Sequence, residues 1–94
     1  MIYSFADPET ERVWRRTRSR KLPPDIQRTA LRKLRQLNRV AAPTELRSPP
    51  GNRFEELKGD REGTYSVRVN DQWRLTFRWH DGGAHDVRIE DYHR

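Results

Sequence analysis

Apolar and polar residues alternate with a period of two along residues 73–79. A strand turns alternate side chains to opposite faces, so this segment predicts one apolar face (Trp73, Leu75, Phe77, Trp79) and one cationic face (Arg74, Thr76, Arg78). The segment contains strong β formers and neither Gly nor Pro, and turn residues flank it. The pattern predicts a strand inside a sheet, with helices covering its apolar face.

A helical period is found in the first half of the chain. Asp7 and Pro8 suit the N-cap and first turn of a helix to about Arg18. A second helix is expected from Pro24 or Asp25 to about Val40, because apolar residues recur there at spacings of three and four (Ile26, Ala30, Leu34, Leu37). We interpret that stripe as core rather than as a partner-binding face.

The remaining segments predict short strands and turns. Strands are expected at 1–6, 54–58, 64–69 and 84–90. A short helical turn capped by Thr44 is expected between the second helix and the strand at 54–58. Short connections favour an antiparallel meander. The order β-α-α-β-β-β-β predicts one α+β domain over residues 1–94, with both helices on one face of a mostly antiparallel sheet.

Composition excludes several classes of protein. The 94 residues contain no Cys, which rules out disulfides, zinc–thiolate sites and Cys nucleophiles, and the three His (80, 85, 93) are scattered and predict no metal site. No apolar run of ten residues and no signal-like N-terminus is present, so a cytoplasmic protein is expected.

The net charge of +6 belongs to the N-terminal half. Residues 1–50 carry twelve Lys and Arg against five Asp and Glu, whereas residues 51–94 carry eight against nine. This balance favours a polyanionic partner, nucleic acid first. A basic helix face that only keeps the protein soluble, or that docks an acidic protein, stays open.

The polar face of the predicted sheet carries several arginines. Three neighbouring strands contribute to it (Ser66, Arg68, Arg74, Thr76, Arg78, Asp86, Arg88). The guanidinium fork suits phosphate oxygens, which favours RNA binding on this face. Cross-strand ladders of Arg with Asp and Glu are the alternative.

Three segments together resemble a known family. They are residues 57–63 (Leu-Lys-Gly-Asp-Arg-Glu-Gly), 70–77 (Asn-Asp-Gln-Trp-Arg-Leu-Thr-Phe) and 90–93 (Glu-Asp-Tyr-His). In these segments the chain resembles the HigB-type toxins of the RelE/ParE superfamily. The resemblance implies a ribosome-dependent mRNA endonuclease that inhibits translation, acts in the decoding site, and is neutralised by a HigA-type helix-turn-helix antitoxin.

The resemblance also implies the site residues. Lys58 and Arg74 take the charge-stabilising positions, and Asp91, Tyr92 and His93 take the C-terminal catalytic positions. Glu55 stands where some members have His, so proton transfer falls to His93 or Glu55, with Tyr92 stacking a base or holding a proton donor. Attack by the substrate's own 2′-OH needs no metal or other cofactor.

Further RNA contacts are expected from two surfaces. Arg68, Arg78 and Arg88 would line the sheet face, while Arg32, Lys33 and Arg35 on the second helix would bind ribosomal RNA phosphates. Two other functions remain open. One is a ParE-like toxin directed at gyrase, against which the residue 91–93 tail argues, and the other is a non-catalytic nucleic-acid or protein-binding module.

Overall fold

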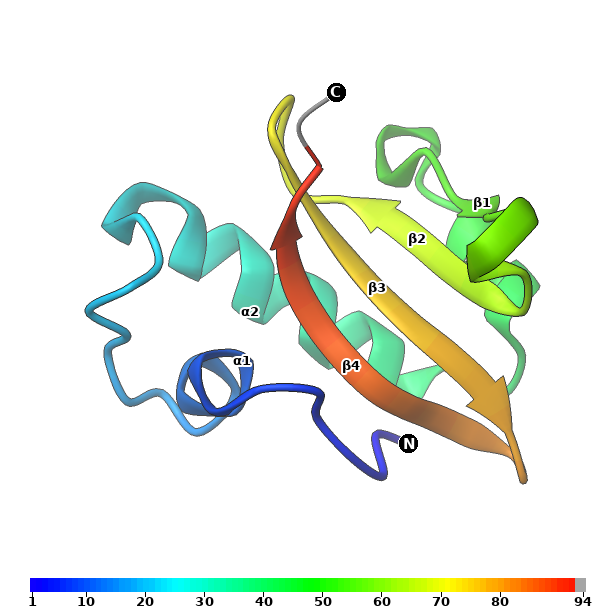
Figure 1. The fold of residues 1–94 in the computed structure, drawn as a ribbon, viewed down its shortest axis with the longest axis horizontal. Helices are drawn as coiled ribbons and strands as arrows, with labels where there is room; N and C mark the ends of the chain where they lie inside the picture. The colour runs from blue at the N-terminus through cyan, green and yellow to red at the C-terminus, as the bar shows by residue number, and fades with distance from the viewer. Residues whose placement is uncertain (93–94) are drawn as a thin grey trace.

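A four-stranded antiparallel sheet with two helices on one side forms the protein (Figure 1). The computed structural model describes residues 1–92. The strands are β1 (Glu55–Glu56), β2 (Thr64–Arg68), β3 (Trp73–His80) and β4 (Gly83–Asp91), in the spatial order β1-β2-β3-β4. The predicted meander is confirmed, and β3 lies inside the sheet as its alternation indicated.

The first helix, α1, spans Pro8–Trp14. Its N-terminus is as predicted, because the Asp7 side chain accepts a hydrogen bond from the Thr10 amide at 2.7 Å. Its C-terminus lies four residues earlier than the predicted Arg18. Arg16 takes the left-handed conformation (φ 61°), which breaks the helical path. The buried Ser19 then holds the following loop by accepting hydrogen bonds from the amides of Lys21 and Leu22.

The second helix, α2, spans Pro24–Arg39 and supplies most of the helical core. The predicted stripe of Ile26, Ala30, Leu34 and Leu37 is buried. It packs in one apolar cluster with the inward side chains of the sheet, among them Leu75, Phe77, Val87 and Ile89. The stripe is therefore core and leaves the charged faces of α2 toward solvent.

The N-terminal segment runs beside β4 but is not a continuous strand. Ile2 and Phe5 form isolated parallel bridges with Ala84 and Val87. Between these two bridges β4 has a bulge, where Asp86 takes φ 51° and its amide donates to the Ser4 hydroxyl. The bulge interrupts a regular ladder, which explains why the strand predicted at 1–6 is reduced to two bridges.

The same bulge changes which side chains of β4 share the polar face. Arg78 of β3 pairs with His85, whereas Thr76 pairs with Arg88. The predicted simple alternation through Asp86 is therefore wrong. Asp86 is the extra residue, and His85 takes its place opposite β3.

The β3–β4 turn has two central residues. Asp81 and Gly82 have φ angles of 52° and 77°, as a two-residue hairpin of the I′ kind requires. The tight turn places the rings of His80 and His85 face to face, with their centroids 3.6 Å apart. The histidines are scattered along the sequence, but His80 and His85 lie in direct contact.

Three short 3₁₀ helices complete the fold: η1 (Pro43–Arg47), η2 (Pro50–Asn52) and η3 (Gly59–Arg61). The predicted Thr44 cap is wrong, because Ala42 is the N-cap of η1 and the Glu45 carboxylate accepts from the amides of Ala41 and Ala42. The fully buried Asn52 ties this region to α2 by accepting from Lys33 and donating to the Leu46 carbonyl. Within residues 1–92, no helix has the length and apolar character needed to cross a bilayer.

Candidate active site

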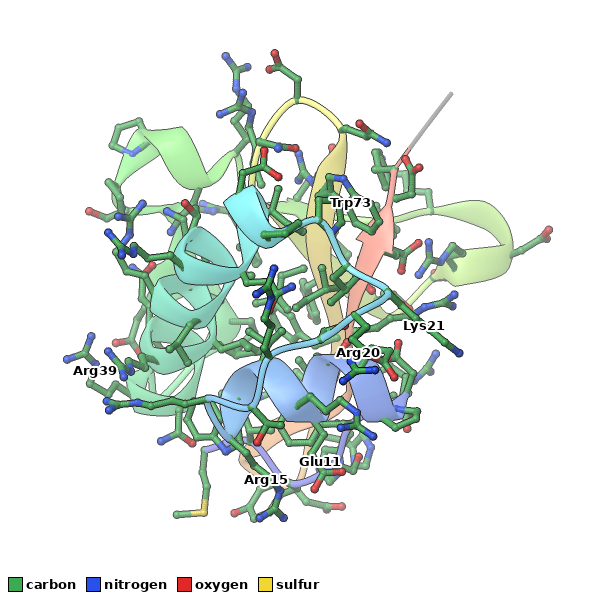
Figure 2. The ribbon with its side chains drawn as sticks, turned by 90° about the vertical axis from the view of Figure 1, so that its left-hand side faces the viewer. Glu11, Arg15, Arg20, Lys21, Arg39 and Trp73 are labelled. Atoms are coloured by element: carbon green, nitrogen blue, oxygen red, sulfur yellow. The ribbon has the colours of Figure 1, made fainter. Side chains whose placement is uncertain are left out.

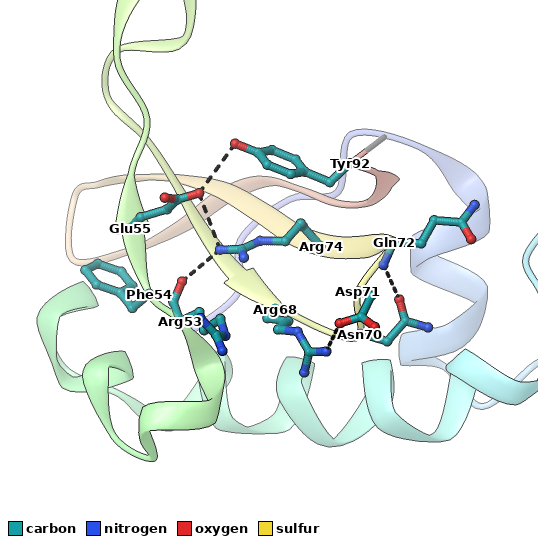
Figure 3. A pocket seen from close by; sticks show the side chains of 9 residues that line it. All are labelled: Arg53, Phe54, Glu55, Arg68, Asn70, Asp71, Gln72, Arg74 and Tyr92. Atoms are coloured by element: carbon teal, nitrogen blue, oxygen red, sulfur yellow. Dashed lines mark hydrogen bonds and ion pairs between the residues drawn. The ribbon is translucent and has the colours of Figure 1, made fainter. Parts of the chain in front are cut away.

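An open cleft lies where β1, the β2–β3 turn and the end of the last strand meet (Figure 3). Its volume is about 960 Å³. Nine residues line it: Arg53, Phe54, Glu55, Arg68, Asn70, Asp71, Gln72, Arg74 and Tyr92. Segments far apart in the sequence therefore contribute to one surface.

Arg74 lies at the centre of this cleft and is held rigidly. Its Nε donates to the Ser66 hydroxyl at 2.6 Å, and its Nη2 donates to the Arg53 carbonyl at 2.8 Å. Burial lowers the pKa of Arg74, while the charges of Glu55 and Tyr92 act in the opposite direction. Since an arginine begins far above neutrality, the guanidinium stays charged and presents a fixed cation to the cleft.

Glu55 of β1 and Tyr92, the residue after β4, both approach Arg74 (Figure 3). The Glu55 carboxylate lies 3.6 Å from Arg74 Nη2, and the Tyr92 hydroxyl donates to that carboxylate at 3.4 Å. The Arg74 guanidinium carbon lies 5.3 Å from the centre of the Tyr92 ring. A carboxylate, a phenol and a guanidinium are thus brought within reach of one small ligand group.

Pairing within the sheet positions these two side chains. Glu55 pairs with Ser66, the residue that also binds Arg74, so β1 places the carboxylate beside the guanidinium. The Tyr92 amide donates to the Gln72 carbonyl at 2.7 Å, which extends the β3–β4 ladder by one residue. Backbone pairing, rather than a loop, sets the geometry of both groups.

Two more arginines border the cleft. Arg68 forms an ion pair with Asp71, and Arg53, exposed at the surface, takes the left-handed conformation with φ 44°. Behind them, the pKa of Lys33 is lowered by its burial and by the charges of Arg32 and Arg68. The lining thus holds three arginines (53, 68, 74) against two carboxylates (55, 71), a small positive excess that suits an anionic ligand.

The structure brings together only part of the predicted catalytic set. Glu55, Arg74 and Tyr92 share the cleft, as predicted. Lys58 and Asp91 are exposed and do not line it, although Asp91 accepts from Gln72, one of its lining residues. His93 lies outside the described residues.

The predicted RNA-binding residues are distributed over two surfaces. Arg68 lines the cleft, whereas Arg78 and Arg88 are exposed along the sheet. On α2, Arg32 and Arg35 are exposed, but Lys33 is half-buried against Asn52. Lys33 thus has a structural contact that its sequence position did not reveal.

The polar face of the sheet is less open than predicted. Ser66, Arg74 and Thr76 are buried, because side chains from β1, η3 and β4 cover them. Glu90 receives two hydrogen bonds from Arg61 at 2.8 Å and one from Thr76 at 2.6 Å. An Arg–Glu ion pair is therefore present on this face, but its arginine comes from η3 and not from a neighbouring strand as the cross-strand alternative proposed.

Several lining residues were missed as functional residues. Asn70, Asp71 and Gln72 were given no role beyond a turn, Arg53 was given no role, and Phe54 was only the first residue of the strand expected at 54–58. For residues 70–72 the sequence did contain an indication of function, because they belong to one of the segments that resemble the family. Arg53 contributes its backbone carbonyl to Arg74, a contact that sequence reasoning cannot find.

Comparisons with known proteins point to one family. Residues 3–93 match the family model described as the RelE-like toxin of the type II toxin–antitoxin system HigB. Toxin HigB-1 of Vibrio cholerae is 40% identical over 93 residues, which is 98% of either chain. The Endoribonuclease HigB of Proteus vulgaris is 46% identical over 41 residues, covering 44% of this chain and 45% of that one.

Solved structures agree in fold. The chain resembles one in the YoeB–YefM complex from Staphylococcus aureus with a TM-score of 0.64 and 17% identity, covering 100% of this chain and 99% of that one. A YafQ mutant from E. coli gives a TM-score of 0.57 at 15% identity, covering 98% and 94%. The family match over nearly the whole sequence and the shared helix-on-sheet architecture lead to one conclusion: this chain belongs to the HigB family of RelE-like toxins of type II toxin–antitoxin systems.

Proposed function

We propose that the protein is an mRNA endonuclease that works in the cytoplasm on translating ribosomes and is held inactive by a HigA-type antitoxin. The single observation that carries the proposal is the meeting of Arg74, Glu55 and Tyr92 in an open cationic cleft. The name of the P. vulgaris relative, an endoribonuclease, supports the same reaction class.

The reaction we propose is attack of a ribose 2′-OH on the adjacent phosphorus. The new O2′–P bond forms as the P–O5′ bond breaks, which leaves a 2′,3′-cyclic phosphate and a 5′-hydroxyl. A base must accept the 2′ proton, and an acid must protonate the departing 5′ oxygen. Negative charge develops on the non-bridging phosphate oxygens and requires a fixed cation nearby.

The cleft residues supply two of these three groups, the cation and the base. The acid that protonates the 5′ oxygen is proposed to be His93, the other proton-transfer residue that the family resemblance implies. Arg74 supplies the cation, because two hydrogen bonds fix its guanidinium before any substrate binds. Glu55 is the proposed base, since its side chain is 44% exposed and lies beside that guanidinium. Tyr92 orients the Glu55 carboxylate through its hydroxyl and offers its ring to a base of the messenger.

Binding to the ribosome fits the basic surface formed by α2 and the loop that follows α1. Figure 2 shows Arg15, Arg20 and Lys21 pointing outward from the loop that follows α1, and Arg39 pointing outward from α2. These groups lie away from the cleft, so phosphate contacts there would leave the cleft free to hold the messenger. The ribosome would then present the codon, and the protein would supply the chemistry.

The direct test is cleavage of a defined messenger in a translating extract, read by mapping new 5′ ends. Wild-type protein is expected to produce cuts within translated frames. Glu55→Gln should slow cleavage by about 10²–10⁴ if it removes the base, and Arg74→Lys by about 10² or more because a lysine cannot reproduce the guanidinium contacts.

A matched control is Arg47→Lys, which changes an exposed arginine of η1 outside the cleft. Circular dichroism would establish that each variant is folded. Wild-type cleavage rates in both cleft variants would contradict the proposed site, and cuts outside translated frames would contradict ribosome dependence.

A further inference from the structure

The β3–β4 turn carries a second cluster of chemically active side chains. His80, Asp81 and His85 each offer a ligand atom, and these three atoms lie within 4.8 Å of one another. His80 Nδ1 lies 3.0 Å from the Asp81 carboxylate, and His85 Nε2 lies 3.0 Å from the His80 carbonyl. The two rings are nearly parallel, with an angle of 9° between their planes.

The hairpin backbone sets the positions of His80 and His85, and the Tyr3 ring packs against His85. The two-residue turn fixes the register, so that His80 pairs with Gly83 and His85 with Arg78. The two histidines are therefore diagonal neighbours on one face of the hairpin. Tyr3 stacks on His85 with ring centroids 5.1 Å apart, and the Tyr3 amide donates to the Ala84 carbonyl at 2.8 Å.

We propose that His80, Asp81 and His85 bind a divalent transition-metal ion of the Zn²⁺, Ni²⁺ or Cu²⁺ class. Two imidazoles and one carboxylate are a donor set that these borderline ions prefer over Mg²⁺ or Ca²⁺. Tetrahedral bonds of about 2.0–2.2 Å require donor atoms roughly 3.3–3.6 Å apart. In the stacked arrangement the in-plane nitrogen lone pairs of the two rings do not converge on one point, so ion binding requires the rings to rotate out of the stack. His80 and Asp81 are exposed and His85 is half-buried, which leaves room for this rotation.

The site is independent of the proposed nuclease cleft. None of its three residues lines that cleft, which lies at the opposite end of β3, beside Gln72 and Arg74. A bound ion would join the end of β3 to the start of β4. Through Tyr3 it would also secure the N-terminal segment, which makes the expected role structural rather than catalytic.

Zn²⁺ titration of single variants tests the proposed metal site. The full-length, untagged protein, stripped with a chelator, is titrated with Zn²⁺ by calorimetry, alongside His80→Ala, His85→Ala, Asp81→Asn and His93→Ala. Asp81→Asn suits this position because asparagine tolerates the left-handed conformation that residue 81 adopts. His93 is the only other histidine in the chain and serves as the matched control.

We expect one Zn²⁺ per chain, with each of the first three variants raising the Kd by about tenfold or more and His93→Ala leaving it unchanged. Circular dichroism of the zinc-free proteins confirms that the variants fold. Absence of saturable binding in the wild type overturns the proposal. So does an equal loss in His93→Ala, or an unchanged Kd in any of the three ligand variants.

Activity separates this proposal from the nuclease. His80→Ala and His85→Ala should cleave messenger at the wild-type rate, because they leave the cleft intact. If the cleft variants lose cleavage but bind Zn²⁺ with the wild-type Kd, the result bears on the nuclease proposal alone. If His80→Ala and His85→Ala lose Zn²⁺ binding but cleave at the wild-type rate, the result bears on the metal site alone.

Discussion

At the scale of single residues, buried charges are stabilised by partners that come from distant segments. Glu90 is the clearest case, with its side chain 12% exposed and bound by Arg61 and Thr76. Burial by itself raises the pKa of Glu90, but hydrogen bonds from Arg61 and Thr76 outweigh it and lower that pKa below its usual value. Arg61 in turn has its pKa raised by the bond to Glu90.

This shift makes a prediction about pH. A carboxyl whose pKa is lower in the folded state stabilises the fold above the unfolded value, near 4.5, and loses that contribution as pH falls through the folded value. Glu90→Gln should therefore lower the free energy of unfolding by about 1–3 kcal/mol at pH 7, because it breaks the Arg61 pair. At pH 3 the difference from wild type should shrink.

Urea titrations at the two pH values measure this difference. Glu62→Gln, an exposed carboxylate close to Arg61 in sequence, is the control and should have little effect at either pH. An equal loss for Glu90→Gln at pH 7 and pH 3 would show that the ionised carboxylate contributes nothing.

At the scale of elements, close contact between the N-terminal segment and β4 depends on one glycine. A Cβ added at Gly83 would collide with the Tyr3 ring and lie 2.7 Å from the Met1 carbonyl oxygen. The Ala84 amide donates to that same oxygen at 2.9 Å. Since backbone cannot move away freely here, only glycine fits at the start of β4.

Gly83→Ala is therefore expected to displace residues 1–3 from β4 and to destabilise the protein by about 1–3 kcal/mol. Hydrogen exchange should show faster exchange of the Tyr3 and Ala84 amides, while amides in α2 keep their relative protection. Gly51→Ala is the matched control, because nothing lies within 4 Å of its added Cβ. Unchanged exchange at Tyr3 would contradict the expected displacement.

At the scale of the whole molecule, most of the basic excess lies away from the proposed nuclease cleft. The basic excess lies in residues 1–50, mainly in the loop that follows α1 (residues 15–21) and in α2. Salt-dependent binding to ribosomal RNA would thus depend on one surface and cleavage on another. The two properties should respond to different mutations.

Replacing Arg32 and Arg35 with Gln, and then with Glu, tests this separation. Both side chains are exposed, whereas Lys33 is left intact because it contacts Asn52. Ribosome pelleting across a salt series should weaken progressively, and the log–log slope of affinity against salt should fall by about one unit for each phosphate that is no longer neutralised. Identical pelleting of all three proteins would remove this surface from the ribosome interface.

Much of the fold followed from patterns that are local in the chain. The period of two in residues 73–79 predicted β3, and the spacing of Ile26, Ala30, Leu34 and Leu37 predicted the buried face of α2. Local geometry fixes both periods, so neighbouring residues alone are enough to indicate the two layers. Resemblance in three short segments then added the family and three cleft residues, Glu55, Arg74 and Tyr92.

Only the tertiary structure decided which side chains meet. It buried Arg74 against the Arg53 carbonyl, left Lys58 and Asp91 outside the cleft, and used a bulge at Asp86 to bring His85 opposite Arg78. These outcomes depend on strand register, on left-handed residues and on loop paths, none of which has a period in the sequence. Patterns along the chain therefore determined the layers and the family, while contacts between distant segments determined the chemistry available at each surface.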